Sequence, residues 1–405
     1  YTTLFRSVLT ALYTIFGGMK SVLYTSVLQT PILLLGSLII LVLGFKELGG
    51  WDEMMRVCGA VTVNNYGDTM TNLIRSNDDA NFPWLGALIG SAIIGFWYWC
   101  TDQFIVQRVL SGKNEMEARR GTIFGAYLKL LPVFLFLIPG MIAFALHQKY
   151  IGAGGEGFLP MLANGTANAD AAFPTLVAKL LPAGVKGLVV CGILAALMSS
   201  LASLFNSSAM LFTIDFYKRF RPETPEKKLV GIGQVATVVI VILGILWIPI
   251  MRSVGDVLYT YLQDVQSVLA PGIAAAFLLG ICWKRTSAQG GMWGLIAGMV
   301  IGLTRLGAKV YYSNAGEVAD STFKYLFYDM NWLFFCGWMF LFCIIVVIVV
   351  SLATKAPTAE KIQGLVFGTA TKEQKAATRA SWNHWDIIHT VIILAITGAF
   401  YWYFW

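Results

Sequence analysis

The chain has 405 residues, of which 57% are hydrophobic and only 13% are charged, and its mean hydropathy is +0.69. Soluble domains are about 45–50% apolar and about 25% charged, so this composition excludes a soluble globular domain, a disordered chain and a disulfide scaffold. Despite the formal net charge of +7, we expect no nucleic-acid partner for so apolar a chain. Runs of about 18 or more apolar residues recur along its length and predict an all-α, multi-pass protein of the plasma (inner) membrane, with the lipid bilayer as its partner.

The segment Tyr1–Ser7 matches a common sequencing adapter read in frame. Processing scars are excluded from fold reasoning, so we expect native sequence to begin near Val8 and residues 8–405 to form one membrane domain. The alternative is that the first seven residues belong to an ordinary helix.

After a stub at 8–18, apolar segments of bilayer length predict nine membrane-spanning helices. The predicted spans are 21–45, 84–107, 121–146, 184–214, 229–251, 257–283, 287–305, 331–354 and 386–405.

The charges of the connecting segments predict the orientation. When these segments are assigned alternately to two sides, one side carries 17 Lys and Arg against 6 Asp and Glu, and the other carries 10 against 12. The positive-inside rule assigns the first side, which includes 108–120 and 355–385, to the cytoplasm.

Three charged residues, Asp102, Lys129 and Asp264, fall within or near predicted spans. Charges at bilayer depth are costly and often mark a transport pathway, but each of these could also be a snorkelling or paired structural residue. Lys129 lies about nine residues inside its predicted helix and has the stronger claim to function.

A hydroxyl-rich cluster lies in the predicted span 184–214. Ser199, Ser203 and Asn206 are spaced i, i+4 and i+7, so they share one helix face. Small polar residues at this spacing hold membrane helices together, and they can also supply neutral oxygens to a hard cation. Spacing alone does not decide between helix packing and cation binding.

The Ala270-Pro271-Gly272 motif interrupts the predicted span 257–283. Broken helices expose backbone groups to substrate and ion in transporters, although a simple packing kink is equally compatible. The six cysteines and three histidines show no metal-ligand spacing and no catalytic constellation appears, so we expect neither an enzyme nor an organic cofactor.

Five stretches together resemble the sodium/solute symporter family, in its sodium/glucose cotransporter-like branch. The stretches are Thr10–Gly18, residues 97–103 with Gln107-Arg108, Gly125–Lys129, Leu197–Leu201 and residues 261–271. The resemblance runs from about residue 8 to residue 405.

The resemblance implies a leucine-transporter-like fold with two inverted five-helix repeats. It implies that this chain is partial, with the first helices of repeat one missing, including a broken first helix that contributes to both the sodium and the sugar sites. Segments 8–18 and 21–45 would end repeat one, 84–283 would form the core of repeat two, and 287–405 would be peripheral helices.

The resemblance also implies site residues. Ser199 and Ser200, with the carbonyl of Ala196, match the family's sodium site. Gln263 and Lys129 match residues that face the sugar, and Tyr98 matches an aromatic gate beneath the sugar ring. A sugar offers hydroxyl edges to amide and ammonium groups and an apolar face to an aromatic ring, so this chemistry is consistent.

Two departures from the family pattern change the expected substrate and stoichiometry. Ser26 stands where some members carry Asp, while its partner on the serine helix, Ser203, is retained; the second sodium site is weakened, and we expect one Na⁺ per substrate. Gly95 stands where the family often has Asn or Thr, so one sugar contact is missing or replaced by water.

The resemblance implies sodium-coupled symport of a hexose, of the glucose or galactose type, by alternating access. One alternative is the same mechanism with myo-inositol or another small solute. The other is a membrane sensor built on a transporter fold, although the longest predicted cytoplasmic segment, 355–385, holds no soluble output domain.

Overall fold

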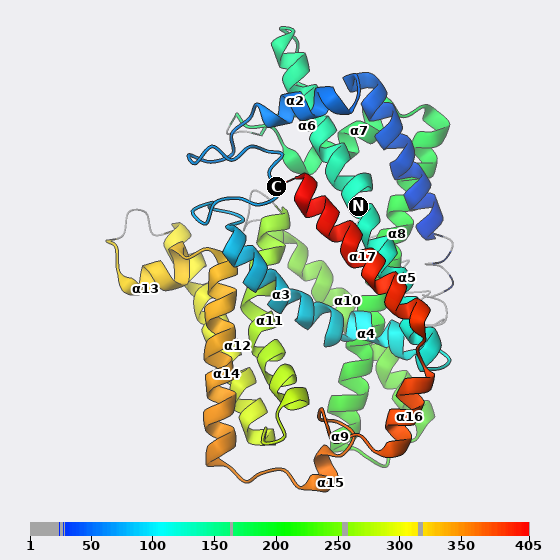
Figure 1. Ribbon diagram of the computed structural model, residues 1–405, viewed down its shortest axis with the longest axis vertical. Helices are drawn as coiled ribbons and strands as arrows, with labels where there is room; N and C mark the ends of the chain where they lie inside the picture. Colours follow the sequence, from blue (N-terminus) through cyan, green and yellow to red (C-terminus); the bar gives the residue numbers. More distant parts are fainter. Residues whose placement is uncertain are drawn as a thin grey trace. The chain divides into compact units, whose positions relative to one another are not determined.

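The computed structural model describes residues 24, 27, 29–162, 165–252, 258–314 and 319–404, and it does not describe the side chains of 247–252, 258–261 and 313–314 (Figure 1). Within these ranges the regular structure is helical, accompanied by three isolated β-bridges. The segment Tyr1–Ser7, the stub at 8–18 and Ser26 lie outside the described residues.

Each predicted span corresponds to a helical segment. In the described part of the chain, eight helices are long and apolar enough to cross a membrane, and a bent helix pair would make a ninth span. The eight are Gln29–Leu48, Glu115–Gly152 (α5 Glu115–Pro132, η1 Val133–Leu137, α6 Ile138–Gly152), Ala183–Phe220 (α8 Ala183–Met210, η3 Leu211–Tyr217, α9 Lys218–Phe220), α10 Glu226–Arg252, α11 Leu258–Cys282, α12 Ala288–Asn314, α14 Trp332–Ala353 and α17 His384–Tyr403.

Short elements connect these helices. They are α2 Trp51–Gly59, η2 Ala169–Ala171, α7 Ala172–Leu180, α13 Thr322–Lys324, η4 Tyr325–Asp329, α15 Ala359–Ile362 and α16 Lys372–Ala380.

Helix ends extend beyond the predicted spans. The segment Glu115–Gly152 has 38 residues, which is about 57 Å at 1.5 Å per residue and exceeds the roughly 30 Å of hydrocarbon. Hydropathy marks only the apolar part of such a helix, because polar turns can continue it into water. For the same reason the span predicted to end at 305 continues to Asn314.

The Ala270-Pro271-Gly272 motif does not break its helix. α11 is continuous with Pro271 inside it. Gly272 instead permits a close approach of α12, because a Cβ added there would lie 3.2 Å from the Cα of Gly298. The motif is therefore a packing feature. The bend of 48° falls between α3 (Trp84–Cys100) and α4 (Gln103–Leu110).

The chain divides into two compact units. Unit 1 comprises Tyr1–Val61 and Leu128–Val257, and unit 2 comprises Thr62–Tyr127 and Leu258–Trp405. The predicted core of repeat two, 84–283, contributes to both units, so this division does not follow the predicted repeats, which stay a prediction.

Small residues bring helices together in unit 1. An added Cβ at Gly36 would lie 2.6 Å from Val189 Cγ2, and one at Gly192 would lie 3.0 Å from Ile32 Cγ2. Helix Gln29–Leu48 and α8 therefore approach through glycine, as is common where membrane helices pack without a hydrophobic driving force.

Unit 2 is built around α11, α12 and α14, with α3 packed against α11 and α14. Its core includes Ile93 and Ile94 of α3, Ala270 and Ala274 of α11, and Leu333 of α14. Helices α3 and α11 of this bundle bear predicted substrate residues. The register in which these two helices pack therefore decides where those residues lie.

Candidate functional site

The serine helix α8 places its predicted sodium ligands in different environments. Ser199 is 7% exposed and Ser203 is fully buried, whereas Ser200 is exposed. The Ser200 hydroxyl donates to the Ala196 carbonyl at 3.1 Å. The structure thus brings together two of the oxygens assigned to the sodium site, one turn apart on the same helix.

The buried side of α8 is continuous. Val189, Gly192, Ser199 and Ser203 fall on one helical face by their spacing. The first two contact helix Gln29–Leu48, so the serines extend a face that is already used for close helix packing. Such a face can supply neutral oxygens to a small cation without introducing a fixed charge.

The break between α3 and α4 is organised by Thr101 and Asp102. The Asp102 carboxylate accepts from the backbone N–H of Phe104 at 3.0 Å and so caps α4. The Thr101 hydroxyl donates to the Trp97 carbonyl at 2.7 Å. Asp102 therefore has a structural role as a helix cap, which is one of the two possibilities that the sequence left open.

Tyr98 and Gly95 lie in the last two turns of α3, just before this break. Tyr98 is half-buried, and its ring meets Trp99 edge-on with the centroids 5.3 Å apart. A Cβ added to Gly95 would meet no heavy atom within 4 Å. The family often has Asn or Thr at this position. Within unit 2, the space that such a side chain would occupy is open.

The packing register separates Tyr98 from Gln263. The Phe96 ring of α3 lies 6.2 Å from the Phe277 ring of α11, and Ile93, one turn earlier in α3, shares a core cluster with Ala270 and Ala274, which precede Phe277, so α3 and α11 run in the same direction. At 1.5 Å per residue, Tyr98 and Gln263 lie at levels roughly 20 Å apart along this helix pair. One sugar ring does not span that separation.

Lys129 lies near the end of α5 in unit 1, three residues before Pro132 and the π-helical turn η1. Its side chain is exposed. Lys129 and the serines belong to unit 1, whereas Gln263, Tyr98 and Gly95 belong to unit 2.

An ion network in unit 2 joins buried Arg305 to the partly buried Asp264, the neighbour of Gln263, and Lys309. Lys309 of α12 donates to Asp264 Oδ2, and Arg305 Nη2 lies 3.7 Å from Asp264 Oδ1. Arg305 is fully buried and donates to the Met330 carbonyl at 2.8 Å. Two cations and one carboxylate thus join α11, α12 and the segment that follows η4.

The Arg305 guanidinium makes two further contacts. It lies 4.0 Å from the centroid of the Phe335 ring and donates to the Leu326 carbonyl at 3.4 Å. Arg305 Nε and Asp264 Oδ1 have no hydrogen-bond partner within the described ranges. Sequence reasoning missed Arg305 and Lys309 because the span was predicted to end at 305, which assigned both residues to an outer segment.

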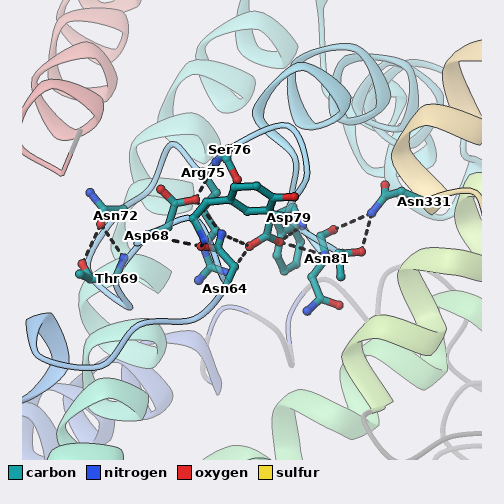
Figure 2. Close-up of polar contacts among 12 residues, drawn as sticks. Asn64, Asp68, Thr69, Asn72, Arg75, Ser76, Asp79, Asn81 and Asn331 are labelled. Carbon is teal, nitrogen blue, oxygen red and sulfur yellow. Dashed lines mark hydrogen bonds and ion pairs between the residues drawn. The ribbon is translucent and has the colours of Figure 1, made fainter.

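A second polar cluster lies in the connecting segment 62–83 of unit 2 (Figure 2). Asn64 Nδ2 donates to Asp68 Oδ2 at 2.7 Å and to Asp79 Oδ2 at 3.2 Å. Asp79 Oδ1 accepts from the backbone N–H groups of Asn81 and Phe82 at 2.9 and 2.8 Å. The carboxylates therefore organise the segment that leads into α3.

This segment is attached to α14. Asn331 Nδ2 donates to the Ala80 carbonyl at 2.7 Å (Figure 2). Trp332 Nε1 donates to the Asn81 carbonyl at 3.1 Å. Burial raises the pKa of Asp79, but hydrogen bonds from Phe82, Asn81 and Asn64, with the charge of Arg75, outweigh it and lower that pKa. The backbone N–H of Ser76 is the main cause of the lowered pKa of Asp68.

Comparison with known proteins identifies the family. The model of the sodium:solute symporter family matches residues 1–298. The chain belongs to this family. The family assignment agrees with the resemblance carried by the sequence motifs, and the chain is a multi-pass membrane protein whose relatives are cotransporters rather than enzymes.

Three curated relatives show the range within the family. The chain is 35% identical to the sodium/mannose cotransporter SLC5A10 of Bos taurus, covering all of this chain and 71% of the relative. It is 36% identical to the sodium/myo-inositol cotransporter 2 of Homo sapiens over 89% of this chain, and 38% identical to the sodium/glucose cotransporter 1 of Ovis aries over 86%. The chain spans only 55% of the length of each of the last two relatives.

A solved structure supports the fold. The substrate-bound outward-open state of a Na⁺-coupled sialic acid symporter matches with a TM-score of 0.65 at 20% identity, over 87% of this chain and 66% of that chain. This likeness confirms the predicted all-α, leucine-transporter-like fold class, and at this identity it concerns the fold alone.

Proposed function

We propose that the full-length protein couples the inward movement of Na⁺ to the uptake of a hexose. The observation that carries the sodium part is the Ser200 hydroxyl on the Ala196 carbonyl, next to buried Ser199, on a helix face without fixed charge. Hard cations prefer oxygen ligands, and neutral ones bind weakly enough to release the ion in each cycle. Relatives named as mannose and glucose cotransporters support the hexose.

For the substrate, we propose that Gln263 donates and accepts hydrogen bonds with sugar hydroxyls, that Lys129 adds an ammonium donor, and that Tyr98 acts as the gate. The separate levels of Gln263 and Tyr98 along α3 and α11 suit a binding contact and a gate rather than two contacts to one ring. Coupling requires only that Na⁺ favour the conformation that binds the sugar. We propose one Na⁺ per sugar, with Ser203 as a residual element of a second site.

A second candidate substrate is myo-inositol. It is supported by the 36% identity to a sodium/myo-inositol cotransporter and by the open space at Gly95, where a side-chain contact to one hydroxyl is missing. A polyol and a hexose present similar hydroxyl edges, so the same amide and ammonium groups serve either.

The test is uptake of radiolabelled glucose by proteoliposomes that contain the full-length protein, with and without an inward Na⁺ gradient. Sodium-dependent accumulation that galactose inhibits is expected. Accumulation of myo-inositol instead selects the second candidate. The absence of sodium-driven uptake of any small solute would contradict the transport proposal and favour a membrane sensor.

A substitution at Gln263 tests its proposed contact with the sugar. Gln263→Ala should raise the apparent KM for sugar about tenfold, the value of one strong hydrogen bond, and should change the sodium dependence much less. The matched control is Gln234→Ala on α10, a half-buried glutamine outside the proposed site. Equal sugar KM in Gln263→Ala and parent would remove Gln263 from the site.

A further inference from the structure

One face of α11 packs against α12 at every fourth residue. This face carries Asp264, Val268 and Gly272. A Cβ added to Gly298 of α12 would lie 2.9 Å from the Cα of Gly272. One added to Gly302 would lie 2.6 Å from Val268 Cγ1. The numbers rise along α12 as they fall along α11, so the two helices run in opposite directions and Asp264 is the next residue of this face.

The contact between the two helices changes in character at Asp264. Where Val268 meets Gly302, the helices touch through glycine, whereas long side chains reach Asp264 from α12. Lys309 donates a hydrogen bond to Asp264 Oδ2, and Arg305 Nη2 lies 3.7 Å from Oδ1. The second turn of α11 is therefore joined to α12 by one direct hydrogen bond and one longer ion pair.

The Asp264 carboxylate has a second arrangement within reach. Its Oδ1 atom is buried and has no hydrogen-bond partner in the described part of the chain. Arg305 is fully buried and is fixed by the carbonyls of Leu326 and Met330. Without Lys309, the carboxylate would close the gap to Arg305, because a buried charge without a direct partner is costly. The aspartate side chain is short, so the backbone of the second turn would move with it.

Gln263 is the residue that such a movement would redirect. It precedes Asp264 in the same turn, and neighbouring side chains on an α-helix point about 100° apart. By its spacing Gln263 shares a face with Ala270 and Ala274, which belong to a core cluster with Ile93 of α3. A rotation of this turn therefore also turns the Gln263 amide relative to α3.

We propose that Lys309 is a positioning residue for sugar binding: by fixing Asp264, it holds the Gln263 amide in the orientation that meets the sugar hydroxyls. This inference rests on the proposed function, in which Gln263 contacts the sugar. Lys309 acts through Gln263 and does not touch the sugar itself. Its side chain is 30% exposed, so replacing it disturbs the packing less than replacing the fully buried Arg305 does.

The experiment measures sodium-driven uptake of radiolabelled glucose, or of myo-inositol if the parent transports that instead, by proteoliposomes that contain the full-length protein. Lys309→Met keeps a long apolar side chain but removes the charge, and it should raise the apparent KM for the solute about fivefold. The maximal rate and the Na⁺ concentration for half-maximal uptake should stay close to those of the parent. Lys309→Arg restores the cation and should recover most of the affinity. The matched control is Lys324→Met, which breaks the surface pair with Asp320 and should leave the KM unchanged.

A double substitution separates positioning from direct contact. If Lys309 acts through Gln263, Lys309→Met should leave the KM of the Gln263→Ala protein almost unchanged, because the group that it positions is gone. Equal fold increases of the KM in the two backgrounds would overturn the proposal, as would a parent-like KM of folded Lys309→Met. Unfolding temperatures in detergent report whether the variants are folded. Asp264→Asn, which keeps the size of the side chain and should raise the KM in the same way, replaces Lys309→Met if that variant is not folded.

These results are distinct from a failure of the proposed function. If Gln263→Ala alone raises the KM and Lys309→Met does not, Gln263 remains a substrate contact and only the positioning role of Lys309 is wrong. If Gln263→Ala alone leaves the KM unchanged, the substrate contact is wrong and the positioning role fails with it.

Discussion

Polar groups are accommodated differently in the two units. The serine face of α8 in unit 1 uses neutral hydroxyl groups, whereas α11 and α12 in unit 2 use a network of paired charges. On α8 the polar groups are neutral: the Ser200 hydroxyl bonds to Ala196 of its own helix, and Ser199 and Ser203 are buried beside it. On α12 fully buried Arg305 and its neighbour Lys309 both pair with Asp264.

The difference follows from the free energy of desolvation. A neutral hydroxyl that loses a partner inside a membrane protein costs little compared with a charge that loses its counter-ion. A face of neutral oxygens can therefore exchange a cation repeatedly, whereas a network of fixed charges holds its helices in one arrangement. The comparison is consistent with the proposed reversible binding of Na⁺ on α8, and it predicts a structural role for the ion network.

The most severe test of this contrast is Arg305→Ala. Removing the guanidinium leaves Asp264 with Lys309 alone and the Met330 carbonyl without its donor, so we expect a loss of about 3–5 kcal/mol in the free energy of unfolding. Thermal unfolding in detergent measures the loss. The control is Lys324→Ala, which removes the surface pair with Asp320 and should have a much smaller effect. Parent-like stability of Arg305→Ala would contradict the structural role of the network.

The glycine contact between α11 and α12 should give the next largest effect. A Cβ at position 298 would lie 2.9 Å from the Cα of Gly272, and backbone cannot move aside as a side chain can. Gly298→Ala should therefore destabilise the protein by about 1–3 kcal/mol.

Two matched glycines sharpen this prediction. Gly307→Ala on the same helix meets nothing within 4 Å and should be neutral or slightly stabilising. Gly36→Ala in unit 1 meets the methyl group of Val189, which can change rotamer, and should be intermediate. We therefore expect Gly298→Ala to have the lowest unfolding temperature, Gly36→Ala an intermediate one and Gly307→Ala the highest. If α11 and α12 were loosely packed, Gly298→Ala would not be the lowest.

On the serine helix we expect a functional effect without a large loss of stability. Ser200→Ala should raise the Na⁺ concentration for half-maximal uptake about tenfold, because it removes a proposed oxygen ligand. Its unfolding temperature should be close to that of the parent, because Ser200 is exposed. Ser208→Ala on the same helix is the control. Unchanged sodium activation would show that the hydroxyls serve helix packing alone.

The smallest effect concerns the carboxylates of segment 62–83. Because the pKa of Asp79 is lowered in the folded protein, its stabilising contribution is present above the ordinary value of 3.8 and is lost as the pH falls below it. Asp79→Asn should cost about 1 kcal/mol at neutral pH. The difference in unfolding temperature between parent and variant should shrink as the pH is lowered toward 3. A difference that stays constant with pH would exclude the ionised carboxylate as its cause.

Much of the helical framework could be predicted from the sequence, because bilayer thickness imposes a minimum apolar length and the lipid leaves helices as the simplest way to satisfy the backbone. Local motifs were harder to interpret. The Ala270-Pro271-Gly272 motif was compatible with either a broken helix or a packing kink, and the bend falls at Thr101-Asp102 instead. A proline kink and a packing glycine look alike until the neighbouring helix is known.

The described candidate site residues Gly95, Tyr98 and Gln263 lie on helices, as expected, but the sequence did not fix their mutual positions. Gly95 and Tyr98 precede the bend of α3 and α4, and the pairing of Phe96 with Phe277 places Gln263 at a different level. Helix register depends on which side chains interdigitate, and hydropathy contains no information on that choice.

By itself the sequence determined that this chain is a membrane protein, which segments are long and apolar enough to span the bilayer, and to which family it belongs. These properties depend on composition, local hydropathy and short motifs. Only the tertiary structure decided that Asp264 pairs with Lys309 and Arg305, that Asp102 caps a helix, and that Tyr127 of α5 meets His389 of α17. Partners of this kind lie up to 262 residues apart in the chain, and only the packing of the helices brings such distant positions into contact.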